Sequence, residues 1–139
     1  MKVLQTLGHR NGFPPTPFYY RREADGIRIE SIVGKKIRRL IDTDVWNEIL
    51  RTVFDNGSEV FGVSSSANSE LDAPKLHDLI KAGSNIGDTR TLAYISAVLV
   101  HEGSLILDHG PRQDDLDARI FLRRSTFTNV DYASRHPES

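Results

Sequence analysis

The segment from residue 18 to residue 41 constrains the fold most. In it, a strong turn signal lies between stretches in which apolar and polar side chains alternate. Asp25-Gly26 is the strongest short hairpin signal in it, since both central residues of a type I′ turn need positive φ. Residues 27–30 alternate between apolar and charged side chains, which is the period of a half-buried strand. Gly34 marks a second turn, and residues 36–41 form the next stretch. The pattern predicts a three-stranded antiparallel meander.

Three stretches of helical periodicity follow the predicted meander. Apolar side chains recur at helical spacing after Asp42-Thr43-Asp44, after Asp72 and after Asp88-Thr89. Side-chain oxygens at these places can cap the free amides of a first helical turn. The expected ends are residues that tolerate a left-handed backbone: Asn56-Gly57, Gly83 and Gly103.

The rest of the chain predicts short strands and irregular ends. Residues 59–63 form a short apolar stretch, and 105–107 with 120–122 predict a hairpin with a long polar tip. The fold class is therefore α+β, with an N-terminal three-stranded antiparallel meander, a three-helix unit and a C-terminal β-hairpin. We expect an irregular arm at residues 1–17, a single domain at 18–125 and a tail at 126–139.

Composition places the chain among water-soluble proteins of ordinary size. It has 139 residues, of which 38% are hydrophobic and 27% charged, enough apolar content for one core. It has no cysteine, which excludes disulfides and thiolate metal sites. No apolar run approaches the roughly 20 residues of a membrane helix, and no signal peptide is evident. The expected location is the cytoplasm, with no membrane partner.

Charge is divided unevenly along the chain. The overall formal charge is −1, but residues 1–41 carry a net +6, residues 42–117 carry −9, and residues 118–139 carry +2. Such a division is informative about surfaces and partners rather than about the fold.

The sequence HEGSLIL at residues 101–107 leads from a predicted helix through Gly103 into a hairpin strand. With the order of elements over residues 42–124, it resembles the winged helix-turn-helix superfamily. In that superfamily the third helix enters the DNA major groove and the wing touches the backbone. The resemblance implies base contacts from Thr89, Arg90, Thr91 and Tyr94, and wing contacts from His109, Arg112 and Arg119.

Basic residues interleaved with aromatic ones also mark the predicted meander. Cations can follow the backbone of a nucleic-acid strand, and rings such as Tyr19 and Tyr20 can stack on its bases. The third predicted helix offers only Arg90, and the wing-like loop is acidic, so we expect the meander to make the main contacts. The cations concerned are Arg21, Arg22, Arg28, Lys35, Lys36 and Arg38. Alternatively, they form a solvated face that discourages edge pairing of the sheet.

Two further hypotheses use other features. The basic and acidic segments could pair within one chain, between copies or with another protein. Trp46, at the edge of a helix stripe, either anchors such an interface or closes the margin of the core. His101, Glu102 and Asp108-His109 could converge on a metal, or Asp114, Asp115 and Asp117 could form a hydrolase or nuclease cluster. No phosphate-binding loop, dinucleotide fingerprint or nucleophile elbow is present in the sequence.

We therefore expect a non-catalytic, nucleic-acid-associated or regulatory binding module of a prokaryote or phage. A protein-interaction or homo-oligomerisation module is the alternative, and a small metal-dependent enzyme is the third hypothesis. No cofactor, catalytic residue or metal ligand is assigned.

Overall fold

The computed structural model describes residues 2–7, 15–55, 60–62, 75–108 and 121–124. The protein has an α+β fold. Its strands and helices are β1 (Lys2–Gln5), β2 (Pro17–Glu23), β3 (Gly26–Ser31), β4 (Arg38–Asp42), α1 (Thr43–Asp55), β5 (Val60–Gly62), α2 (Leu76–Ser84), α3 (Thr89–His101), β6 (Leu105–Asp108) and β7 (Phe121–Arg124).

The first sheet is antiparallel, with the strand order β1-β2-β3-β4. Strands β2, β3 and β4 are the predicted meander. The expectation of an irregular arm at residues 1–17 is wrong for β1, which pairs with β2 and makes a fourth strand. Thr6 and Thr16 hold the two segments together, since the Thr6 amide donates to the Thr16 carbonyl at 2.9 Å. The alternation of β1 is too short to signal a strand without this partner.

The first hairpin turns one residue earlier than the sequence predicts. Glu23 pairs with Gly26, so the turn residues are Ala24 and Asp25. Asp25 does not adopt positive φ, and Gly26 has a φ of 155°. A Cβ on Gly26 would overlap the carbonyl oxygen of Ile41 on β4. The glycine is therefore required by the close approach of β4 rather than by a type I′ turn.

Helix α1 begins as its cap signal predicts, because Asp42 Oδ1 accepts a hydrogen bond from the Val45 amide at 3.0 Å. Its predicted apolar face is buried at Ile49, Leu50, Val53 and Phe54. Trp46 is also buried, with only 1% of its surface exposed. Its burial agrees with the interpretation that Trp46 closes the margin of the core, and it leaves no exposed ring to anchor an interface.

Helix α2 packs on α1, and α3 packs on α2. Gly83 lies inside α2, and a Cβ there would meet Thr52 Oγ1 of α1 at 2.9 Å. The helix ends instead at Asn85, which adopts the left-handed conformation with a φ of 63°. The predicted cap at Asp72 lies outside the described residues. In α3, Asp88 is the predicted cap and accepts from the Thr91 amide.

The predicted C-terminal hairpin is present as β6 and β7, which pair antiparallel. It does not stand alone, because β5 pairs with the other edge of β7 and makes a three-stranded sheet in the order β5-β7-β6. The loop between β6 and β7 and the tail from residue 126 lie outside the described residues.

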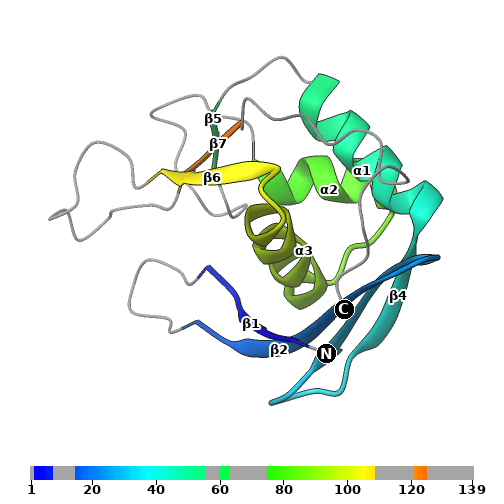
Figure 1. Ribbon diagram of the computed structural model, residues 1–139. Coiled ribbons are helices and arrows are strands. Elements are labelled where there is room, and N and C mark those ends of the chain that lie inside the picture. The colour runs from blue at the N-terminus through cyan, green and yellow to red at the C-terminus, as the bar shows by residue number, and fades with distance from the viewer. Residues whose placement is uncertain (1, 8–14, 56–59, 63–74, 109–120, 125–139) are drawn as a thin grey trace, which may run out of the picture.

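Helix α3 lies between the four-stranded sheet and α2 (Figure 1), and α1 packs against β3 and β4 as well as against α2. The rings of Phe18 on β2 and Tyr94 on α3 stack with centroids 4.3 Å apart. Eight of the thirteen residues of α3 are buried. Within the described ranges, no helix is both long and apolar enough to cross a membrane.

Candidate nucleic-acid interface

Helix α3 does not offer the surface that the winged-helix resemblance implies. Thr91 and Tyr94, two of its implied base-reading residues, have 0% of their surface exposed. Burial raises the pKa of the Tyr94 phenol. A helix that reads bases must lie in the major groove with its side chains free. The structure therefore removes Thr91 and Tyr94 from the residues that can read a base.

Arg90 contacts the protein itself. Its Nη1 donates to the carbonyl oxygen of Val33 at 2.8 Å, across the connection between β3 and β4. Gly34, with a φ of 75°, lies directly against the guanidinium, and a Cβ there would be 2.5 Å from Nη1. The hydrogen bond from Arg90 therefore links the start of α3 to the β3–β4 connection. The implied wing residues His109, Arg112 and Arg119 lie outside the described residues.

Arg22 is also an internal residue, although it was expected to bind nucleic acid. Only 4% of its surface is exposed, and its Nε donates to Glu102 Oε2 at 2.7 Å. The Tyr20 hydroxyl donates to the same carboxylate. Strict alternation along β2 places Tyr20 and Arg22 on the face that packs against the helices. Arg22 therefore cannot reach an external strand.

The same contacts bear on the metal hypothesis. Glu102 is engaged by Arg22 and Tyr20, and His101 lies edge-on to the Tyr20 ring. No group of three or more metal-ligating side chains occurs in the part of the chain that the structure describes. His109 and the cluster Asp114, Asp115 and Asp117 lie outside that part.

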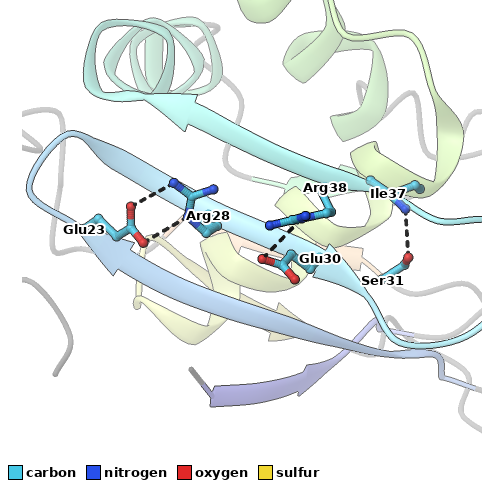
Figure 2. A network of polar contacts seen from close by, with 6 residues as sticks. All are labelled: Glu23, Arg28, Glu30, Ser31, Ile37 and Arg38. Carbon is cyan, nitrogen blue, oxygen red and sulfur yellow. Dashed lines mark hydrogen bonds and ion pairs between the residues drawn. The ribbon is translucent and has the colours of Figure 1, made fainter.

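The outward face of the four-stranded sheet, which we call the open face, collects several predicted residues. Val3, Tyr19, Glu30 and Arg38 stand in one row across the four strands, and Arg21, Arg28 and Leu40 stand in the next. Two of its cations are paired with acids (Figure 2): Arg28 Nε lies 3.0 Å from Glu23 Oε2, and Arg38 Nε lies 3.8 Å from Glu30 Oε2.

A second group of cations lines a pocket at the edge of the sheet, which we call the basic pocket. The pocket has a volume of about 320 Å³ and lies between the β3–β4 connection, β4 and the start of α3. Its lining residues are Lys35, Lys36, Ile37, Arg38, Arg39, Asp88 and Thr91. The four cations are all exposed to solvent.

Local structure explains why these cations gather. Ser31 closes the β3–β4 connection, because its amide donates to the Ile37 carbonyl and its Oγ accepts from the Ile37 amide, both at 2.8 Å. In β4, Arg38 pairs with Glu30 on the open face, and Arg39 pairs with the buried Ile29 on the inner face. Among the described strands, β4 lies at the edge of the sheet, with β3 on one side and no described strand on the other. Cations from both faces can therefore reach one pocket.

The charge of the pocket is four cations against one carboxylate. The hydrogen bond from Thr91 lowers the pKa of Asp88, and the positive charges of Lys35 and Arg39 lower it further. Asp88 is therefore ionised at neutral pH. Because it caps the Thr91 amide, it also offsets part of the positive end of the α3 dipole. Because Glu30 compensates Arg38 at 3.8 Å and Asp88 supplies one negative charge, a net positive charge of two remains among the described residues around the pocket.

The sequence interpretation missed two residues of this pocket, Arg39 and Asp88. The alternation of residues 36–41 puts Arg39 on one face with Ile37 and Ile41, and Asp88 was recognised only as a helix cap. The signal in the sequence was the high density of basic residues, since Lys35, Lys36, Arg38 and Arg39 fall within five positions. Blocks of like charge mark a functional surface more often than the position of any single cation does.

Comparison of the chain with protein-family models, curated proteins and solved structures finds no match to any of them.

Proposed function

We propose that the protein is a non-catalytic binding module for nucleic acid. It contacts the phosphate backbone through the basic pocket. The observation that carries this proposal is the convergence of Lys35, Lys36, Arg38 and Arg39 on one pocket beside α3. The winged-helix mode, with α3 in a groove, is not part of the proposal because α3 is buried.

The lining of the pocket favours an anion over an apolar ligand. Pockets for small apolar molecules are lined mainly by hydrophobic side chains, whereas Ile37 is the one apolar residue here. Arginine forks pair with phosphate oxygens at two points, and lysines supply compact charges beside them. Neutralisation of backbone phosphates by such cations dominates affinity for nucleic acid.

Protection of a sheet edge does not explain the pocket by itself. If these cations only discouraged pairing of the sheet edge, their side chains would not need to line the same pocket. On the open face, Arg28 and Arg38 are compensated by Glu23 and Glu30. At the pocket, Asp88 is the acid among the described lining residues, and even with Arg38 compensated by Glu30 it faces the three cations Lys35, Lys36 and Arg39, which repel one another. An anionic ligand would relieve that repulsion.

Charge reversal at Lys36 tests the proposal. Fluorescence anisotropy of a labelled DNA strand should show that Lys36→Glu weakens binding by roughly tenfold or more at low salt, since it replaces attraction by repulsion. Arg51→Glu is the matched control, because Arg51 is exposed in the middle of α1 and does not line the pocket. Equal loss in both variants would indicate a response to net charge, and no loss in either would refute the pocket as the site.

Self-association is the second candidate, supported by exposed apolar side chains near the pocket. Ile32, Val33 and Leu40 are 39%, 47% and 37% exposed. A second copy would bury them together with the charged surfaces around them. This candidate predicts a mass above 15.6 kDa at low salt that falls as salt rises. A monomer at every salt concentration would refute the charge-driven form.

A further inference from the structure

The open face combines an exposed ring with a cation that has no acid beside it. Tyr19 is 39% exposed near the middle of the sheet, so its ring is accessible from outside. Arg21 follows it by two residues, so both side chains leave the same face of β2. In the described part of the chain, no acidic side chain lies within ion-pair distance of Arg21.

The position of Arg21 is not explained by the stability of the sheet. Its direct partner on β3 is Arg28, and like charges directly opposite each other destabilise a strand pair. Glu23 compensates Arg28, with Oε2 3.0 Å from Nε, which leaves Arg21 as the excess charge. A residue of opposite charge or a neutral β-former at this place would serve the fold better. The presence of Arg21 opposite Arg28 is explained if an anion from outside the protein binds Arg21.

The open face is continuous with the basic pocket through Arg38. Arg38 stands in the same cross-strand row as Tyr19, and it also lines the pocket. Two strand spacings separate Tyr19 on β2 from Arg38 on β4, which is about 10 Å. Glu30 lies between them, but its charge faces Arg38 at 3.8 Å (Figure 2). A chain molecule lying across the strands can reach the ring and the pocket together.

We propose that the open face is a stacking platform for single-stranded nucleic acid, with a base on the Tyr19 ring, Arg21 at a neighbouring phosphate and the strand leading past Arg38 into the basic pocket. This inference rests on the proposed function and gives it a substrate class. Unpaired bases stack on aromatic side chains, and neighbouring cations follow the backbone. Paired bases are stacked within the duplex, so their faces cannot reach Tyr19.

The test measures the affinity of Tyr19→Ala, by anisotropy, for labelled oligodeoxythymidylate and for a labelled, fully paired duplex. Loss of a stacked base should weaken single-strand binding by roughly 5- to 150-fold and leave duplex binding unchanged. Tyr19→Phe keeps the ring and should restore single-strand binding to the wild-type level. Leu40→Ala is the control, because Leu40 is on the same face with similar exposure and has no ring.

Each remaining outcome decides between the two proposals. If Lys36→Glu weakens binding but Tyr19→Ala binds both probes as the wild type does, the platform is refuted and the pocket stands. Equal losses for Tyr19→Ala and Leu40→Ala would also refute a stacking role. If the wild type binds neither probe at low salt, both proposals fail. The emission of Trp46, which is 1% exposed, reports whether each variant is folded.

Discussion

Arg22 on β2 and Glu102 at the end of α3 form a buried ion pair that joins the sheet to the central helix. Their side chains are 4% and 5% exposed, and Arg22 Nε lies 2.7 Å from Glu102 Oε2. The Tyr20 hydroxyl donates to the same carboxylate. These donors replace the water that both charges lose on burial. The pair thereby turns Arg22, one of the predicted nucleic-acid contacts, into part of the scaffold.

Removal of Glu102 should take from the buried Arg22 the carboxylate of this ion pair. We predict that Glu102→Ala lowers the free energy of unfolding by about 3–5 kcal/mol. Urea unfolding followed by Trp46 emission measures this change. Glu48→Ala is the control, since the Glu48–Arg51 pair is more than half exposed and should contribute no more than about 1 kcal/mol. Equal losses in the two variants would contradict a structural role for the buried pair.

Asp88 should oppose ligand binding while it supports the fold. We predict that Asp88→Asn tightens single-strand binding by roughly two- to fivefold, because it removes the one carboxylate among the described residues that line the basic pocket. Asparagine caps a helix about as well as aspartate, so the α3 cap should persist. Anisotropy titration measures the change. Weaker binding in this variant would contradict the electrostatic account of the pocket.

The same residue should give a defined pH dependence of stability. The Thr91 hydrogen bond lowers the Asp88 pKa below its ordinary 3.8, so the ionised form is favoured in the folded state. That contribution is fully present above the unfolded pKa and is lost as pH falls through the folded one. Wild type should therefore lose more stability than Asp88→Asn below about pH 3.8. Parallel stability curves would show that Asp88 does not contribute.

Gly34 should be needed for the shape of the β3–β4 connection. It adopts a φ of 75°, and a Cβ would be 2.5 Å from Arg90 Nη1. We predict that Gly34→Ala lowers stability by about 1–2 kcal/mol and also weakens binding, since the connection carries Lys35 and Lys36. Gly87→Ala is the matched control, because nothing lies closer than 3.9 Å to its Cβ. Thermal unfolding and anisotropy of both variants decide the point.

Local patterns predict most of the secondary structure. The alternation after Gly26 and the apolar spacing after Asp42 each depend on neighbouring residues, and the structure has both elements. Strand β1 depends on a partner more than ten residues away, which no local pattern reveals. Strand β5 matches the short strand that residues 59–63 predict, but its pairing with β7, which follows the helices, could not be read from a local pattern.

The candidate site was less predictable than the fold, for a physical reason. The sequence identifies basic residues but not their burial. Arg22 and Arg38 are therefore equal candidates for binding until the positions of β2 and β4 in the fold are known. Strand alternation then separates them: Arg22 faces α3, whereas Arg38 faces solvent on an edge strand. Arg90 shows the same limit, since its role depends on the carbonyl of Val33, which lies far away in sequence.

The salt dependence of single-strand binding tests the central claim most directly. Anisotropy titrations of wild type, Arg39→Gln and the control Arg51→Gln with oligodeoxythymidylate give the slope of log affinity against log salt. If the basic pocket holds backbone phosphate, the wild-type slope is steeply negative, Arg39→Gln reduces its magnitude by about 0.7, and Arg51→Gln leaves it unchanged. A slope near zero, or the same slope for wild type and Arg39→Gln, would contradict the account.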